Sequence, residues 1–186
     1  MDKRERLVST AFTLFYARGI HAVGINLVLA ESGIAKKTLY HHFPGKEDLV
    51  EAAVRYRDSR YRAWLESRLD QVPIGKPALL ELFSALDDWF HSRVPEIEPF
   101  HGCFFINASA EYGDRDNRIH RACAEHKAGI TALIRKHVEA LSLPEGRADE
   151  ITRLIVLLKE GAISMAHVQG NLDAAREARG LLEGML

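Results

Sequence analysis

Apolar side chains recur along this chain at intervals of three and four residues, the spacing that places them on one face of an α-helix. Six prolines separate the periodic stretches, and proline is poorly tolerated inside a helix. No stretch alternates apolar and polar residues as a half-buried strand does, and the Asn-Gly and Asp-Gly turns of tight hairpins are absent. The pattern therefore predicts an all-α protein of about nine helices, near residues 3–18, 25–32, 35–41, 46–69, 77–94, 101–112, 115–141, 147–169 and 172–184.

The second and third predicted helices are short and are joined at Ser32-Gly33, where glycine accepts a backbone conformation that other residues resist. Leu39 and Phe43 are four residues apart, so we expect both to anchor the third helix to the core. The other side chains of that helix are polar: Lys36, Lys37, Thr38, Tyr40, His41 and His42. Two short helices with a tight turn and a projecting polar face are typical of a helix-turn-helix that enters the DNA major groove.

The charge distribution supports this interpretation, although the net charge of −1 does not. Residues 1–68 carry 12 Lys and Arg against 8 Asp and Glu, whereas residues 69–186 carry 13 against 18. A basic N-terminal third attached to an acidic remainder indicates a module at one end that faces a polyanion.

The stretch from Leu29 to Leu49, LAESGIAKKTLYHHFPGKEDL, resembles the DNA-binding signature of TetR-family transcriptional regulators. Thr38-Leu39-Tyr40, the following Phe43, and Lys46 lie at the spacing of that signature. The resemblance implies a homodimer that binds a palindromic operator in double-stranded DNA and releases it when a small-molecule effector enters the C-terminal part. It therefore implies a helix-turn-helix DNA-binding domain at residues 1–46 and a helical ligand-binding and dimerisation domain at residues 47–186.

The resemblance also assigns roles within the recognition helix. Lys36, Lys37, Tyr40 and His41 become candidate contacts to bases or phosphates, and Thr38 and Lys46 become phosphate contacts. A lone pair of lysines is usually just part of the solvated surface, so Lys36 and Lys37 by themselves are weak evidence for DNA binding. The complete signature in register favours DNA binding.

Aromatic residues are concentrated between residues 64 and 112. The resemblance implies a ligand cavity among the middle helices, lined by apolar rings with a few polar groups that orient the ligand. The candidates are Trp64, Phe83, Trp89, Phe90, Phe104, Phe105, Asn107 and Glu111. The alternative is an ordinary core, because aromatic residues at helical spacing more often fill cores than pockets. The sequence does not identify the effector.

The last long helices carry wide apolar stripes with several small residues, as expected of helices that cover more than one neighbour. Such helices from two protomers would form a four-helix bundle, and reading two half-sites of an operator requires a dimer. The candidate interface residues are Ile130, Leu133, Ile151, Leu154, Ile155, Leu158, Ala162 and Met165. The alternative is burial within one protomer.

The two cysteines raise a further possibility. Gly102-Cys103 resembles a Gly-Cys pair that opens the mid-chain helix in a subgroup of the TetR family, and a cysteine at a helix N-terminus favours the thiolate. Cys103 therefore supports a thiol-redox or metal-sensing regulator as an alternative, although a buried, inert cysteine is the simpler interpretation. Cys123 and His126 share one helix face but form no recognisable four-ligand set, so we predict no metal and no cofactor.

Catalysis and membrane insertion are both disfavoured. The chain carries no Gly-x-Ser-x-Gly, His-Glu-x-x-His or phosphate-loop motif, so we predict that it is not an enzyme. A small helical enzyme that uses Cys103 as a nucleophile is the alternative. The longest apolar run is five residues, at 154–158, and the N-terminus lacks the apolar core of a signal peptide. We therefore expect a cytoplasmic protein that does not bind membranes.

Overall fold

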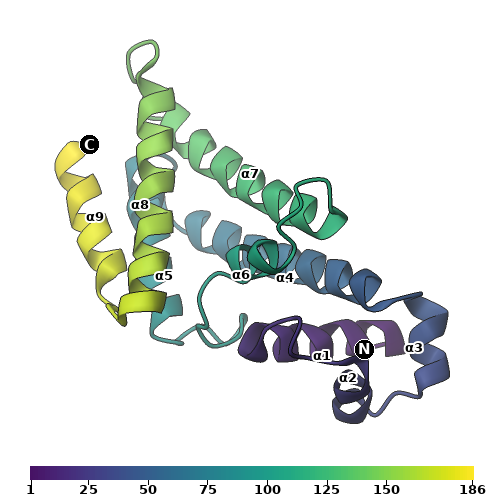
Figure 1. The fold of residues 1–186 in the computed structure, drawn as a ribbon. Helices are drawn as coiled ribbons and strands as arrows, with labels where there is room; N and C mark the ends of the chain where they lie inside the picture. The colour runs from purple at the N-terminus through teal and green to yellow at the C-terminus, as the bar shows by residue number, and fades with distance from the viewer. The chain divides into compact units, whose positions relative to one another are not determined.

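The computed structural model describes residues 1–186 and is entirely helical (Figure 1), which confirms the predicted fold class. Its nine helices are α1 (Lys3–Arg18), α2 (Ile25–Ser32), α3 (Lys36–His42), α4 (Lys46–Leu69), α5 (Lys76–Phe90), α6 (Phe104–Glu111), α7 (Arg118–Glu139), α8 (Arg147–Gln169) and α9 (Ala174–Met185). None of them combines the length and the apolar character that crossing a bilayer requires.

Three helices are shorter than the periodicity predicts, and local backbone geometry explains each difference. Helix α5 ends at Phe90 because Ser92 has a φ of 54°, outside the helical region. Helix α6 starts late because Gly102, just ahead of it, has a φ of 82°. Helix α7 starts at Arg118 because the Asn117 side chain accepts the N–H of Ile119 at 2.8 Å and so caps it.

The chain forms two compact units. The first comprises residues 1–59 and 103–126, and the second comprises residues 60–102 and 127–186. Helices α4 and α7 each begin in the first unit and end in the second. The functional boundary expected near residue 46 stays a prediction.

The first unit is built on α1, which packs against α2 and α3. The Asp2 side chain caps α1 by accepting the N–H of Glu5 at 2.7 Å. Apolar side chains from four helices fill the core, and the fully buried ones include Leu7, Phe12, Val28, Leu39 and Leu49. This core fixes α3 from beneath and leaves its other side to solvent.

Aromatic contacts attach α6 to α1 within the same unit. The ring of Phe104 meets Phe12 edge to face, with 5.1 Å between the centroids. Arg57 of α4 is only 1% exposed, and its guanidinium lies over the rings of Phe12 and Tyr16 at 5.5 and 5.3 Å. A buried guanidinium thus packs against the aromatic face of α1.

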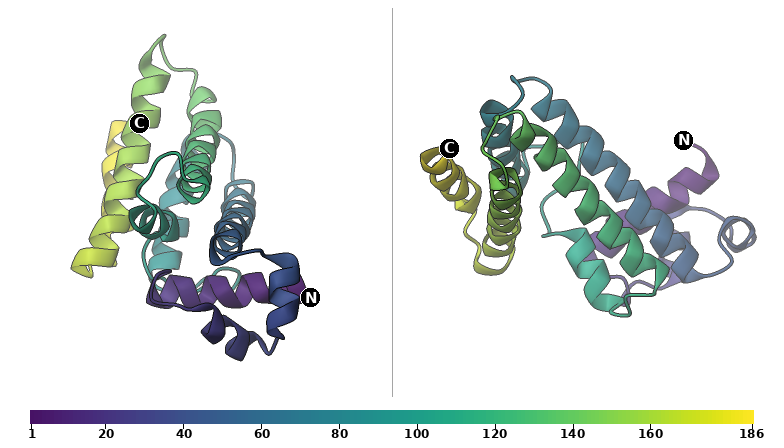
Figure 2. Two further views of the ribbon diagram at one scale, coloured as in Figure 1. Left: turned by 45° about the vertical axis from the view of Figure 1, so that its right-hand side comes forward. Right: turned by 90° about the horizontal axis from the view of Figure 1, so that it is seen from above.

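In the second unit, α9 packs against both α5 and α8, and Figure 2 shows α9 running beside α8. Small residues of α9 permit this approach, because Ala175 and Ala178 are buried there together with Leu182. Phe83 and Leu86 of α5 are fully buried. The three helices therefore share one apolar layer.

A partly buried ion cluster joins α7 to α8. Glu160 accepts from Lys127 at 2.6 Å and from Lys159 at 2.8 Å, and Lys159 is only 2% exposed. Burial works to raise the pKa of Glu160, but the two ammonium groups outweigh it and lower the pKa to about 2. The ionised carboxylate is what makes burial of Lys159 tolerable.

Glu160→Gln should therefore lower stability at neutral pH, with a pH dependence of fixed sign. A carboxyl whose pKa is depressed by folding stabilises the protein above its ordinary value of 4.5 and loses this effect as the pH falls towards 2. The difference in Tm between the wild type and the variant should thus shrink between about pH 4.5 and 2 in thermal scans. Glu139→Gln, at an exposed position on α7, is the control and should change Tm little. A difference that does not depend on pH would contradict this assignment.

Candidate nucleic-acid interface

The turn between α2 and α3 has the geometry that a helix-turn-helix requires. Gly33 has a φ of 64°, in the left-handed region, and its N–H closes α2 on the carbonyl of Leu29 at 3.0 Å. Leu39 and Phe43 are 0% and 3% exposed, so they hold α3 against the core as the sequence predicts. Helix α3 is thereby rigidly placed with one face outward.

The outward face of α3 carries most of the candidate DNA contacts. Lys36, Lys37 and His41 are exposed, and Tyr40 is 46% exposed although it is a large aromatic residue. The Lys36 ammonium lies 5.9 Å from the centre of the Tyr40 ring. These side chains form a cationic and aromatic surface with no acidic residue on the helix itself.

Lys46 has a different environment. Its ammonium donates to the carbonyl of Ile20 at 2.7 Å, and burial lowers the pKa of Lys46, although the charge of Glu111 works against this shift. Lys46 thus ties the start of α4 to the loop that follows α1. An ammonium has three donors, so this bond leaves capacity for a phosphate.

A second basic group lies beside the turn and is not singled out by the sequence analysis. A hollow of about 340 Å³ lies between the start of α1 and the turn, and Lys3, Arg6 and Thr38 line it together with Gly33. The three basic residues near the start of α1, Lys3, Arg4 and Arg6, are the sequence feature that indicates this group. These cations extend the positive surface of α3 towards the N-terminus.

Glu111, at the end of α6, holds the loop after α1. Its carboxylate accepts the backbone N–H groups of Ile20 and His21 at 2.7 and 2.6 Å and also contacts the His21 ring at 2.6 Å. Partial burial works to raise the pKa of Glu111, but these hydrogen bonds outweigh it and keep the pKa below its usual value. Together with Lys46, Glu111 fixes the segment that leads into α2.

Glu111→Ala should loosen this segment. Two charge-assisted bonds from backbone N–H groups are lost, and the one from Ile20 is partly buried, so we expect a loss of about 1–3 kcal/mol in the free energy of unfolding. Hydrogen exchange at the amides of Ile20 and His21 should be faster in the variant than in the wild type, and this increase should exceed any increase within α1. Glu125→Ala provides the control, because Glu125 is 63% exposed and contacts only a side chain, Arg55. Unchanged exchange at Ile20 would show that the carboxylate does not hold the loop.

The comparisons agree with this geometry. A family model described as bacterial regulatory proteins of the tetR family matches residues 7–53. A second, described as the C-terminal domain of LmrA/YxaF-like transcriptional regulators, matches residues 80–179, more than half of the chain. The HTH-type transcriptional regulator Rv0196 of Mycobacterium tuberculosis is 31% identical over 96% of this chain and 93% of its own length. The chain belongs to the TetR family of transcriptional regulators.

Two further TetR-type relatives cover nearly the whole chain. The TetR-family regulator SCO4454 from Streptomyces coelicolor has a crystal structure that superposes with a TM-score of 0.85, at 31% identity over 98% of this chain and 93% of that one. The HTH-type transcriptional regulator LmrA of Bacillus subtilis is 26% identical over 89% of this chain and 86% of its length. The resemblance therefore extends through the C-terminal helices.

In this TetR-family protein, most of the candidate ligand residues lie in packed cores. Phe83, Phe90, Phe104, Phe105 and Trp89 are each at most 3% exposed, and Asn107 is half-buried. The ring of Phe105 stacks on His126, with 3.4 Å between the centroids, and His126 contacts Asp58 at 2.7 Å. Glu111 of the same set is engaged with the backbone after α1, as described above.

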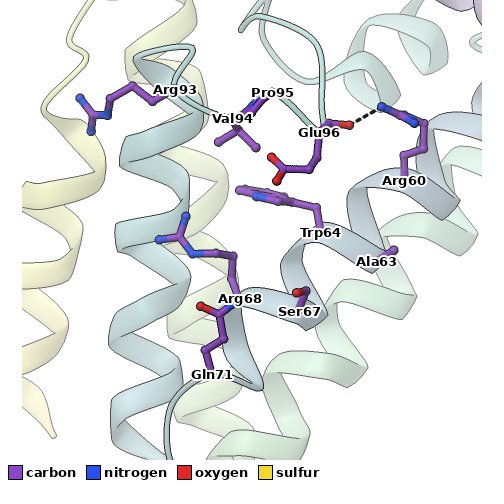
Figure 3. Close-up of a pocket in the computed structure, with 10 residues that line it drawn as sticks. All are labelled: Arg60, Ala63, Trp64, Ser67, Arg68, Gln71, Arg93, Val94, Pro95 and Glu96. Carbon is purple, nitrogen blue, oxygen red and sulfur yellow. Dashed lines mark hydrogen bonds between the residues drawn. The ribbon is translucent and has the colours of Figure 1, made fainter.

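A pocket of about 520 Å³ lies in the second unit, between the second half of α4 and the loop after α5 (Figure 3). Trp64 lines it and is the one member of the candidate ligand set that does. The other lining residues are Arg60, Ala63, Ser67, Arg68, Gln71, Arg93, Val94, Pro95 and Glu96. Sequence analysis missed these residues because they come from two segments that only the fold brings together.

The Gly102-Cys103 pair has a steric role that the sequence does not reveal. A Cβ at position 102 would lie 2.7 Å from the ring of His167, so a side chain there would force that ring to move, and the φ of 82° adds backbone strain. Cys103 precedes the first turn of α6 and is 7% exposed, and Cys123 is 3% exposed. Both sulfur atoms are therefore largely shielded from solvent.

One group of possible metal ligands is present in the second unit. Asp87, His91 and Asp173 each offer a ligand atom within 4.8 Å of the others. Arg176 contacts Asp87 at 3.0 Å and Asp173 at 2.7 Å, and Arg93 contacts Asp87 at 2.6 Å. These guanidinium groups already neutralise the carboxylates, so the group forms an ion-pair cluster that joins α5 to α9.

The candidate interface residues divide by burial. Those buried within the chain are Ile130, Ile151, Ile155 and Ala162, and those half-buried are Leu133, Leu154, Leu158 and Met165. Another line along α8 is exposed and apolar, with Leu157 71% and Val168 76% exposed and Gly161 between them. Leu181 and Met185 of α9 are exposed as well. Leu157, Gly161 and Val168 are separated by four and seven residues, and this spacing indicates from the sequence that they share one side of a helix.

Proposed function

We propose that this TetR-family protein binds a palindromic operator as a homodimer, represses transcription from it, and is released by a small-molecule effector. The carrying observation is the rigidly held helix α3, whose exposed face is cationic and lies within the segment that matches the family's DNA-binding model. The named relatives are transcriptional regulators, and this supports a regulatory rather than a catalytic role.

For DNA contact, we infer that Lys36, Lys37, Tyr40 and His41 meet base edges or phosphates. Thr38 and Lys46 meet phosphates, and the cations beside Thr38 in the hollow next to the turn add to the electrostatic attraction. Phosphate contacts fix the register of the protein on the duplex, and base contacts select the sequence.

For dimerisation, α8 supplies the two most exposed large apolar side chains of the second unit, and α9 adds two more exposed ones. Leu157 and Val168 lie on one line of α8, and Leu181 and Met185 lie on α9. The family's use of paired half-sites makes a second copy of this chain the expected partner. Leu154, Leu158 and Met165 flank the line, whereas the buried Ile151, Ile155 and Ala162 support it from within the protomer.

For the response to an effector, α4 is the natural lever because it starts next to α3 in sequence and its second half lines the pocket. A ligand shifts the equilibrium only if it binds one conformation more tightly than the other. Release therefore requires that the effector favour a conformation with mismatched recognition helices.

The thiol-sensing alternative finds less support. A sensing cysteine needs access to its oxidant, and Cys103 is 7% exposed. Membership of the Gly-Cys subgroup stays a prediction, as does the cytoplasmic location.

Fluorescence anisotropy tests the proposal with DNA from immediately upstream of the gene and a scrambled duplex as control. We expect tight, sequence-selective binding whose logarithm falls steeply with the logarithm of salt concentration. Weak and equal binding of both duplexes across several upstream segments would overturn the proposal.

A further inference from the structure

We propose that the pocket between α4 and the loop after α5 binds a small aromatic carboxylate, an inference that rests on the proposed response to an effector. Its volume of about 520 Å³ lies within the range of small-molecule sites. Its lining combines a flat aromatic side chain, aliphatic contacts and fixed guanidinium groups. An aromatic ring with one carboxylate matches that combination.

The apolar part of the pocket suits a planar ring. The Trp64 indole extends from α4 towards Val94, as Figure 3 shows, and Pro95 and Ala63 contribute further apolar surface. Aromatic rings pack on one another in offset or edge-to-face arrangements. Trp64 therefore provides the surface for an aryl group.

The charged part favours an anion over a cation. Three of the lining residues are arginines, Arg60, Arg68 and Arg93, against the single carboxylate of Glu96. The carboxylates that pair with Arg68 and Arg93, on Glu81, Asp87 and Asp88, do not line the pocket. The lining therefore carries more guanidinium groups than carboxylates, and Figure 3 shows the Arg93 side chain directed away from Trp64, at the edge of the pocket.

The guanidinium groups are also held in place before any ligand arrives. Arg68 contacts Glu81 at 2.6 Å and Asp88 at 2.9 Å, and Asp88 in turn contacts Arg93 at 3.0 Å. The hydrogen bonds to Asp88 and Asp87 raise the pKa of Arg93. A preorganised fork loses less entropy when it binds a carboxylate, and guanidinium is the side chain that pairs with one in a bidentate manner.

The wall opposite α4 is a loop tied at several points. Arg60 donates to the backbone carbonyl of Glu96, and the Ser92 hydroxyl accepts the N–H of Phe100 at 3.1 Å. Ser92 holds a φ of 54°, a conformation that non-glycine residues adopt at a cost and that recurs at ligand clamps. This loop continues into α6, the helix that ends at Glu111. A ligand in the pocket would therefore contact a segment that is directly connected to α6.

The test uses three isosteric probes that differ in charge: benzoate, benzamide and benzamidine. The chain has two tryptophans, so Trp89→Phe leaves Trp64 as the only indole, and none of the probes absorbs at its excitation wavelength near 295 nm. We expect benzoate to change Trp64 emission with an affinity at least roughly fivefold above that of benzamide, with benzamidine weakest. Equal affinities, binding by none of the probes, or tighter binding of benzamidine would overturn the proposal.

Charge variants locate the site. Glu96→Gln should strengthen benzoate binding severalfold, because the bond from Arg60 goes to the main-chain carbonyl and survives the change. Arg93→Gln should weaken it by a similar factor. Arg55→Gln, on the first half of α4 and outside the pocket, is the matched control and should leave the affinity unchanged. Equal effects of all three variants would place the benzoate elsewhere and overturn the proposal.

This readout does not depend on DNA. Operator binding without any benzoate site would remove the inference and leave the proposed regulator standing. Benzoate binding in a protein that fails to bind operator would do the reverse. Release of operator by benzoate in the anisotropy assay would connect the two.

Discussion

Replacing both Lys36 and Lys37 by alanine is expected to weaken specific operator binding strongly under physiological salt. Both side chains are exposed on the face of α3 that projects from the core. The proposed homodimer would present them twice. Each lysine that neutralises a phosphate adds about one unit to the slope of log affinity against log salt. We expect a loss of roughly a hundredfold in affinity at 150 mM salt and a shallower slope, both measured by anisotropy.

The fold of the double variant should survive, because Leu39 and Phe43 still anchor α3. Circular dichroism and thermal unfolding check this directly. Lys136→Ala is the matched control, since Lys136 is an exposed lysine on α7 outside the helix-turn-helix. Wild-type affinity and slope in the double variant would refute the assignment of α3 as the recognition helix.

The second large effect is expected from Leu157→Glu combined with Val168→Glu. If the exposed line of α8 packs against a second copy, the variant buries charges without partners, and each costs several kcal/mol. Sedimentation should then show a monomer where the wild type is a dimer. Operator affinity should fall by about two orders of magnitude or more, because a single half-site provides only part of the contact.

The control for this pair is Ile74→Glu. Ile74 is 56% exposed in the connection between α4 and α5, so the substitution places a single glutamate at an exposed apolar position outside the α8 and α9 surface. We expect it to remain dimeric and to bind operator normally. A double variant at α8 that remains dimeric would move the interface to another face of the protein.

The sequence predicts the fold well where local chemistry decides it. The bounds of α1, α4 and α8 agree with the prediction because glycine, proline and periodic apolar residues punctuate them. The recognition helix is equally legible, since its anchors Leu39 and Phe43 are four residues apart. Local patterns carry this information because each interaction lies within one or two helical turns.

The candidate sites in the C-terminal part are harder to predict from the sequence, because they depend on which helix faces pack against one another. The stripe of α8 is apolar on two sides, and only the packed structure separates Ile155, which is fully buried, from Leu157, which is 71% exposed. The pocket beside Trp64 combines α4 with a loop some thirty residues further along. The carboxylate of Glu111 meets a loop about ninety residues earlier, and no periodicity encodes such a pairing.

The contact between Glu111 and the loop after α1 affects how this protein can be divided to build chimeric regulators. An engineer who grafts residues 1–46 onto a foreign regulatory body transfers the recognition helix but leaves Glu111 behind, together with the α6 segment that belongs to the first compact unit. The portable cassette for a chimeric regulator is therefore discontinuous: it includes residues 103–126 as well as the N-terminal stretch. A recipient protein needs a carboxylate at the position equivalent to Glu111. Without it, the grafted DNA-binding domain has two backbone N–H groups, those of Ile20 and His21, that can bond only to water.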